Sequence, residues 1–427
     1  MRFHRSDSPQ PGAAYPISWP VLAGLLVLLG TGALPAFGAD GADPPSYWRY
    51  RGCIHVHTRF SDGSGTMEQV TDAAQKAGLE FVVITDHNTL DAAKEGGERY
   101  WGNLLVLVGT EVSTDAGHVL ALDVPPTFTW PDRQPQHVID AINQSGGFGI
   151  LAHPMSRSWL WTDWSVHGYR GIEVINLAGL IDDDLRSAIH GHANPFAIPR
   201  MLRIIRRYKR DPRSLLASIS ADMVPAERGK WDELLKSSPP MVGSAGVDAH
   251  ARMLVLGKGY KVPTYQESFE TVQVTVLTDK PLAHSIAQDR DLIFDAVRAG
   301  RLYMVYTRPA LAPRFSFTAT SGGMQATLGQ ELQLNGTARF QVQAPDHPHP
   351  LIRLLQDGKE IAAVEGAKLE WEAKAPGVYR AEVYAADDAK RLLKPAKPGK
   401  MPRLGPLIDK EKRGLRPWVF SNPIYLK

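Results

Sequence analysis

Residues 51–88 read RGCIHVHTRFSDGSGTMEQVTDAAQKAGLEFVVITDHN, and this stretch decides the fold. His55 and His57 stand two residues apart in a run typical of a β-strand, so both imidazoles point to one face. Asp62 follows in a polar turn, and after a helical stretch the apolar run 81–84 leads to His87. Two successive strand ends therefore deliver three imidazoles and a carboxylate toward one place.

Short apolar runs alternate with helical stretches over most of the chain. Continuous apolar strands separated by helices indicate a parallel sheet, either open or closed into a barrel, and hence the α/β class. The expected strands are 50–56, 81–85, 104–108, 119–124, 148–152, 172–175, 241–247 and 272–277, with helices at 67–77, 136–144 and 292–299.

Metal-capable side chains lie at or beside the end of nearly every apolar run. VDAH places Asp248 and His250 two residues apart, again on one face of a strand. Active sites of barrels gather at the carboxyl ends of the strands, so this placement favours the barrel. The nine candidate metal ligands are His55, His57, Asp62, His87, Glu111, His118, His153, Asp248 and His250.

Six separated motifs carry a family resemblance: HVHTRFSDG, ITDHN, GTEVS, GHVLAL, AHP and VDAH, in this order along the chain. Together they resemble the polymerase and histidinol phosphatase (PHP) family, over about residues 50–305. The resemblance implies a distorted (β/α)7 barrel with a centre of two or three metal ions. Many members of that family hydrolyse phosphate esters.

The resemblance also implies a role for each ligand. A carboxylate at Asp62, where some family members have histidine, is similar to the branch of nucleotide phosphatases and carbaryl hydrolase-like metallohydrolases. The implied ligands are His55, His57, Glu111 and Asp248 for a first metal, Glu111, His118 and His153 for a second, and Asp62, His87 and His250 for a third.

The expected chemistry follows from these ligands. Imidazole and carboxylate donors suit manganese, zinc or iron, and clustered divalent ions lower the pKa of a shared water. The resulting bridging hydroxide would be the nucleophile, which makes Glu111 and Asp248 catalytic. Arg157, after the His153 strand end, is the third predicted catalytic residue, because a guanidinium there could contact an anionic substrate.

We therefore expect a metal-dependent hydrolase, and we favour a phosphoesterase, either a phosphatase or a phosphodiesterase, acting on a small-molecule phosphate ester. A carboxyl ester or carbamate hydrolase is the alternative, because the same hydroxide can attack a carbonyl. A metal-containing binding protein without catalysis is the third interpretation.

Residues 178–240 are too long for an ordinary crossover, and we expect a helical insertion. Its basic run 200–213 is typical of a solvated amphipathic helix, with a phosphate- or nucleic-acid-attracting patch as the alternative. A nucleic-acid partner stays open but is not favoured. The cluster Trp159, Trp161 and Trp164 forms either a lid over the pocket or packing under a loop.

The first 38 residues are typical of a secretory signal peptide, because an uncharged apolar segment, 21–34, follows a basic start and precedes small residues. We expect export to the periplasm or the extracellular space, without stable membrane insertion after cleavage. An uncleaved membrane anchor is the alternative. Residues 39–49 form a lead-in. Cys53, the one cysteine, is expected to be a small buried hydrophobe, with a soft extra metal ligand as the alternative.

Composition and the C-terminal pattern complete the expected domain organisation. The chain has 427 residues, of which 43% are hydrophobic and 22% charged, as in ordinary globular proteins, and its net charge of +3 argues for no particular partner. Residues 50–308 are expected to form the barrel. Short strands between turns then predict a small all-β, sandwich-like accessory domain over 309–427, with a loop at 390–413.

Overall fold

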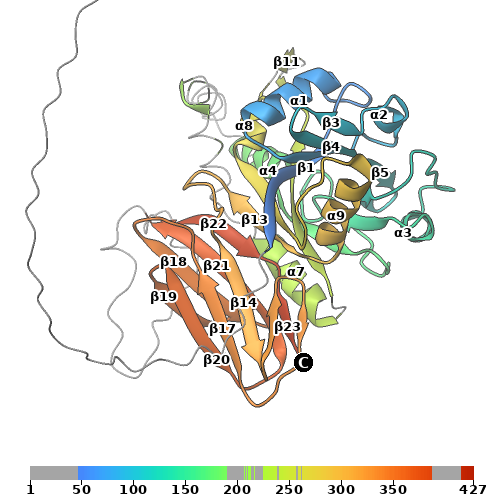
Figure 1. Ribbon diagram of the computed structural model, residues 1–427. Helices are drawn as coiled ribbons and strands as arrows, with labels where there is room; N and C mark the ends of the chain where they lie inside the picture. Colours follow the sequence, from blue (N-terminus) through green and yellow to red (C-terminus); the bar gives the residue numbers. More distant parts are fainter. Residues whose placement is uncertain are drawn as a thin grey trace, which may run out of the picture. The chain divides into compact units, whose positions relative to one another are not determined.

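The structure of the protein is a computed structural model (Figure 1). Within the described part of the chain, no helix is both long and apolar enough to cross a bilayer. The predicted signal peptide 1–38, most of the basic run 200–213 and the predicted loop 390–413 lie outside the described residues. The described residues are 47–189, 206, 208, 210–212, 216, 225–237, 240–255, 258–260, 262–386 and 415–427.

The α/β region comprises the described residues up to 306. Its elements are β1 (Trp48–Val56), α1 (Met67–Lys76), β2 (Phe81–Ile84), α2 (Asp91–Lys94), β3 (Arg99–Trp101), β4 (Leu104–Val108), β5 (Thr110–Thr114), β6 (Gly117–Leu122), α3 (Pro135–Gln144), β7 (Phe148–Leu151), β8 (Gly171–Asn176), α4 (Leu177–Ile189), α7 (Pro225–Ser237), β9 (Val242–Ala249), β10 (Met253–Val255), β11 (Lys258–Tyr260), α8 (Tyr265–Phe269), β12 (Val272–Thr278), α9 (Ile286–Arg298) and β13 (Leu302–Tyr306).

A parallel sheet forms the centre of this region. Strands β4, β2, β1, β9, β8 and β7 are hydrogen-bonded neighbours in this order, and each adjacent pair is parallel. Apart from residues 48–51 at the start of β1, their side chains are almost entirely buried, which explains why these runs are continuously apolar. Since the strands are parallel, their carboxyl ends meet at one edge, where His57, His87, His153 and His250 follow β1, β2, β7 and β9.

Strands β5 and β6 depart from the expected alternation of strands and helices. Gly109 alone separates β5 from β4, and a two-residue turn then returns the chain as β6, which is antiparallel to both β5 and β7. A tight turn can join only antiparallel strands, so no crossover helix forms here. The α/β class is confirmed, whereas a closed (β/α)7 barrel is not shown by these pairings and stays a prediction.

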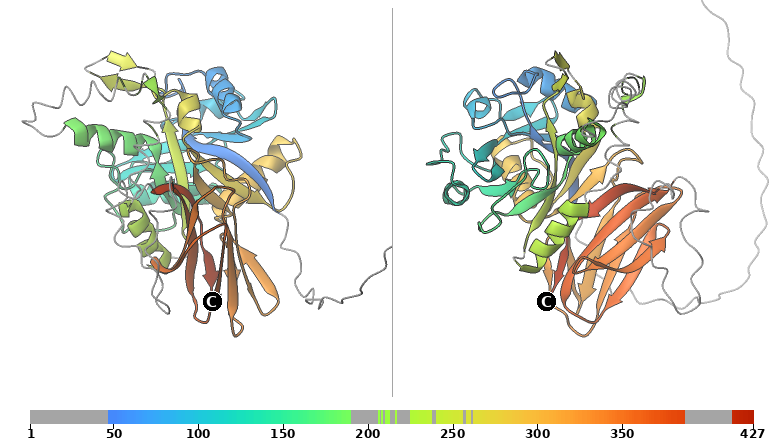
Figure 2. Two further views of the ribbon diagram at one scale, coloured as in Figure 1. Left: turned by 90° about the vertical axis from the view of Figure 1, so that its left-hand side faces the viewer. Right: turned by 180° about the vertical axis from the view of Figure 1, so that it is seen from behind.

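The C-terminal β region is rich in sheet, as the sequence predicts (Figures 1 and 2). Strands β15, β14, β17 and β20 form one antiparallel sheet, and β19, β18, β21 and β22 form the other layer. Side chains of both layers share one apolar core, in which the Phe340 and Tyr379 rings stack 4.3 Å apart. The elements are β14 (Ser316–Ser321), β15 (Met324–Thr327), β16 (Glu331–Leu332), β17 (Ala338–Gln343), β18 (Pro350–Gln356), β19 (Lys359–Glu365), β20 (Lys368–Ala373), β21 (Gly377–Ala386), β22 (Leu415–Ser421) and β23 (Ile424–Leu426).

The two regions are joined by strand pairing and by buried ion pairs. Strand β13 pairs with β12 on one side and with β22 on the other, so hydrogen bonding continues from one region into the next. The fully buried Glu382 of β21 accepts hydrogen bonds from three guanidiniums: Arg228 of α7, at 2.8 Å, Arg353 of β18, at 3.0 Å, and Arg380. A boundary between residues 308 and 309 stays a prediction.

Candidate metal centre

Glu111, in β5, lies at the centre of the predicted ligands and is fully buried. Its Oε2 atom lies 3.0 Å from His55 Nε2 and 3.2 Å from His57 Nε2. Its Oε1 atom lies 2.8 Å from His118 Nδ1 and 3.0 Å from His153 Nε2. One carboxylate therefore separates two pairs of imidazoles and faces each pair with a different oxygen.

Asp248, at the end of β9, approaches the first imidazole pair from the other side. Its Oδ1 atom lies 3.5 Å from His55 Nε2, 3.3 Å from His57 Nε2 and 3.3 Å from His250 Nδ1. The ligand atoms of His55, His153 and Asp248 also lie within 4.8 Å of one another. The structure thus links His153 to both imidazole pairs.

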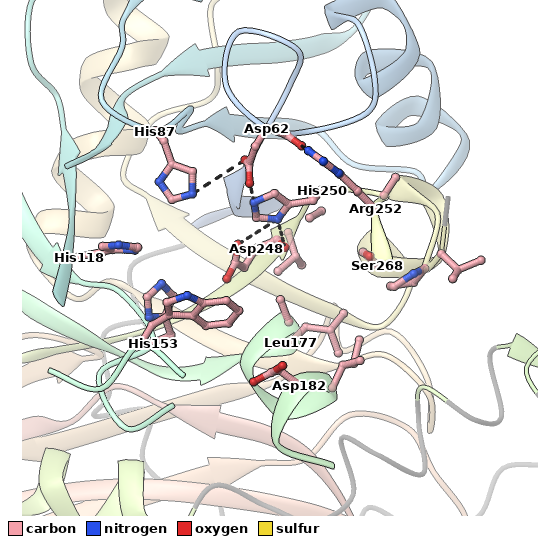
Figure 3. A pocket seen from close by; sticks show the side chains of 18 residues that line it. Asp62, His87, His118, His153, Leu177, Asp182, Asp248, His250, Arg252 and Ser268 are labelled. Carbon is pink, nitrogen blue, oxygen red and sulfur yellow. Dashed lines mark hydrogen bonds and ion pairs between the residues drawn. The ribbon is translucent and has the colours of Figure 1, made fainter. Parts of the chain in front are cut away.

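Asp62 marks the outer part of the centre, where its carboxylate is half exposed (Figure 3). Its Oδ1 atom lies 3.0 Å from His250 Nε2, and 3.9 Å from both His57 Nδ1 and His87 Nε2. These four residues form a further group with all ligand atoms within 4.8 Å. All nine predicted ligands are therefore brought together by the fold.

Unpartnered imidazole nitrogens show that the donor set fits divalent cations. Both ring nitrogens of His57, and Nδ1 of His87 and of His153, are buried without a hydrogen-bond partner among the described residues. Buried polar atoms are rarely left in this state unless they serve another ligand. His55, His153 and Asp248 also adopt positive φ angles of 72°, 31° and 48°, the kind of strain that clusters at functional sites.

Glu173, in β8, is a residue that the sequence analysis missed. Its Oε1 atom lies 2.8 Å from His55 Nδ1, and its Oε2 atom accepts hydrogen bonds of 2.8 Å from His153 N and from Asn176 Nδ2. Gly246 makes room for it, since a Cβ atom there would lie 1.8 Å from Oε1. Glu173 therefore fixes the His55 ring with Nε2 toward Glu111, the usual task of a carboxylate behind a metal-binding histidine.

Sequence comparison identifies the family. The profile of the PHP domain matches residues 54–162. An uncharacterized protein of Methanocaldococcus jannaschii is 30% identical over 120 residues, which are 24% of this chain and 67% of that protein. The chain belongs to the PHP family. The family expected from the six motifs is thus confirmed, and the protein is an enzyme of the PHP metal-dependent type.

Two further proteins are similar to this chain. A phosphoribosyl 1,2-cyclic phosphate 1,2-diphosphodiesterase of Eggerthella lenta is 42% identical over 80 residues, which are 17% of this chain and 30% of that protein. Among solved structures, a two-domain protein of Bacteroides vulgatus containing a predicted PHP-like metal-dependent phosphoesterase is 15% identical. The similarity covers 82% of this chain and 95% of that one, with a TM-score of 0.41.

The ligands of the PHP centre differ in the direction in which their surroundings shift their pKa values. Burial alone would lower the pKa of His57, but the Asp248 and Glu111 carboxylates, 3.3 and 3.2 Å from its Nε2 atom, raise it to about 9. Burial lowers the pKa of His87 to about 4, against the attraction of the Glu111 carboxylate. Burial would raise the pKa of Glu111, yet the surrounding imidazoles hold it well below its ordinary value. Glu111 is thus ionised at neutral pH, and the His87 imidazole is uncharged.

Two neighbours of the ligands have structural tasks. Asp86 accepts hydrogen bonds of 2.7 Å from both the backbone N–H and the hydroxyl of Thr58, and one of 2.5 Å from the Ser61 hydroxyl. The Asp86 carboxylate therefore holds the loop that carries Asp62 in place, and not an imidazole ring. Cys53 is buried with its Sγ atom 3.4 Å from the Val272 carbonyl oxygen, as a small hydrophobe, and belongs to no ligand group among the described residues.

A cavity of about 560 Å³ opens beside the PHP centre (Figure 3). Of the described residues, Arg252 is the arginine that lines it, whereas Arg157 is exposed and is not among the lining residues. Trp159 also lines the cavity, with its ring centroid 5.5 Å from that of His153, while Trp161 is buried in the core. Arg252, two residues after the last ligand, thus lines the cavity, whereas contact of Arg157 with a substrate stays a prediction.

Proposed function

We propose that this protein is an exported metal-dependent phosphoesterase that hydrolyses a small-molecule phosphate ester. One observation carries the proposal: the Glu111 carboxylate lies between two sets of imidazoles, with one oxygen for each. A carboxylate in this position can hold two cations a few ångströms apart, as a two-metal hydrolase requires. Export rests on the sequence pattern of residues 1–38 alone.

The chain's own donors define where two or three ions of manganese, zinc or iron would bind. His55, His57 and one oxygen of Glu111 form one site, and His118 and His153 face the other oxygen of the same carboxylate. The group around Asp62 forms the outer site. Bound ions would supply a bridging hydroxide at neutral pH and would polarise the phosphoryl oxygens. Glu111 keeps the ions adjacent, and Glu173 keeps the imidazole of His55 turned toward them.

Arg252 supports a phosphate rather than a carboxyl ester as substrate. Its guanidinium lines the cavity, and its Nη1 atom donates a hydrogen bond of 3.2 Å to the carbonyl oxygen of Asp62. A guanidinium at this point pairs well with the charged oxygens of a phosphoryl group and gives little to a neutral carboxyl ester. The similarity to the diphosphodiesterase of Eggerthella lenta supports the same substrate class. Carboxyl ester or carbamate hydrolysis is the alternative.

The test is hydrolysis by Glu111→Gln after reconstitution with manganese, zinc or iron. Glutamine keeps the size but removes the charge between the ions, so phosphate mono- and diester hydrolysis falls by orders of magnitude. Glu372→Gln, on the exposed surface of β20, is the matched control and keeps wild-type activity. Thermal unfolding checks that both variants fold. Full activity in a folded Glu111→Gln, or an inactive metal-loaded wild type, rejects the proposal.

A further inference from the structure

The cavity beside the metal centre has two unlike sides. One side is formed by the ligand imidazoles and carboxylates together with Arg252. The other, with Leu177, is apolar, and the cavity's further apolar lining residues are Trp159, Ile181, Val262 and Pro263. In Figure 3, Leu177 lies across the cavity from Asp62 and His87. The two sides therefore suit the two ends of a substrate with a charged head and an apolar body.

The apolar side is held by well-packed residues. Leu177 is fully buried and Ile181 is 7% exposed, one turn apart on the first turns of α4. The indole of Trp159, in contrast, is 40% exposed although it adjoins His153. A large aromatic ring left open beside a metal centre gains from covering by a ligand, because aromatic burial is strongly favourable. The indole thus offers a stacking surface next to the reacting group.

A carboxylate stands at the apolar side. Asp182, from α4, lines the cavity, and the hydroxyl of Ser158 donates a hydrogen bond to it. A second anionic group on the body of the substrate would approach this carboxylate. Like charges in a partly desolvated cavity repel, so this side selects against bodies that carry phosphate or carboxylate.

We infer that the organic part of the substrate is an uncharged aromatic or apolar group, which stacks on the exposed Trp159 and packs against Ile181. The inference rests on the proposed function, because it assumes that the phosphoryl group occupies the polar side. The cavity volume agrees with it: a phosphoryl group alone fills only a small part of about 560 Å³, and sites of roughly 300–1,000 Å³ accept drug-sized ligands.

Calorimetric binding of non-hydrolysable phosphonates to the manganese-loaded full chain tests the inference without any contribution from leaving-group reactivity. Benzylphosphonate should bind about tenfold more tightly than methylphosphonate, the amount expected from stacking one ring on an indole. 4-(Phosphonomethyl)benzoate, which adds a carboxylate to the ring, should lose most of this gain. Trp159→Ala should reduce the benzyl-to-methyl ratio to about threefold or less.

Trp48→Ala is the matched control, because Trp48 is 51% exposed and lies at the start of β1, outside the cavity. Ile181→Ala, on α4, should lower the same benzyl-to-methyl ratio. This variant serves as the test if Trp159→Ala does not fold. Equal binding of the benzyl and methyl compounds to wild type overturns the inference and leaves the proposed function standing. Failure of both phosphonates to bind the metal-loaded protein rejects the proposed function itself.

Discussion

Replacing Glu173 by glutamine tests how the His55 ring of the metal centre is held in its orientation. The carboxylate accepts three N–H groups, from His55 Nδ1, His153 N and Asn176 Nδ2, each at 2.8 Å. A glutamine side chain has one acceptor oxygen, so its NH2 group must face one of these donors. If it faces the ring, His55 carries its proton on Nε2, which is the atom turned toward Glu111 and needed for a metal.

The expected cost is a metal affinity about 10- to 100-fold weaker, or about 1.4–2.7 kcal/mol, the range for lost partners behind metal-binding histidines. One effect opposes it: the Glu173 charge helps to hold the pKa of His55 well above its ordinary value, so its removal eases proton competition. The His55 tautomer decides whether the net metal affinity falls or rises. A proton on Nε2 blocks the ligand atom directly, so we expect the affinity to fall. Chelator-competition titrations with manganese or zinc measure the affinity of Glu173→Gln, with the exposed Glu233→Gln as control. A folded Glu173→Gln that binds metal as tightly as wild type refutes this reasoning.

Four further results are expected. Gly246→Ala places a methyl group against the same carboxylate and should weaken metal binding as well as lower stability by about 1–3 kcal/mol, measured by denaturant unfolding. Arg252→Ala should weaken transition-state stabilisation by about 1–3 kcal/mol, seen as a lower kcat/KM for phosphoesters, and should leave kcat/KM for neutral carboxyl esters unchanged. Arg157→Ala should change kcat/KM for neither substrate class. Metal affinity should rise with pH up to about 9, because His57, with a pKa of about 9, must lose its proton to bind. Equal metal dissociation constants at about pH 6 and about pH 8.5, measured by equilibrium dialysis, contradict this. Glu382→Gln should destabilise the fold by about 3–5 kcal/mol, seen in thermal unfolding, because three buried guanidiniums lose their shared carboxylate; an unchanged melting temperature contradicts this.

The sequence predicts the parts of the centre that lie at strand ends. His55 and Asp248 lie at the ends of β1 and β9, and His57 and His250 directly follow these strands. Both members of each pair reach the same centre, as a period of two residues predicts. The parallel order of the main strands follows from their continuous apolar character. These inferences need only local geometry, which a sequence contains.

Features that depend on a partner far along the chain were not predicted. Glu173 sits inside the apolar run GIEVIN, and a charged residue in a buried strand needs a partner. That signal was present, but only the fold reveals that the partners are His55 and His153. The choice between Arg157 and Arg252 depends on loop direction, which spacing does not determine. Strand β6 was expected, but not its antiparallel pairing, which a two-residue turn imposes.

The junction between the two regions has a consequence for modularity. A chain cut at the predicted boundary after residue 308 would lose β22, which covers the edge of β13, and would leave Arg228 without its buried acceptor. The ring of Tyr306, packed edge to face on Phe420, would also face water. The metal-binding half is therefore not a self-contained unit that evolution or an experimenter can exchange freely. Any shuffled or shortened relative must first supply its own substitute for this strand and this carboxylate.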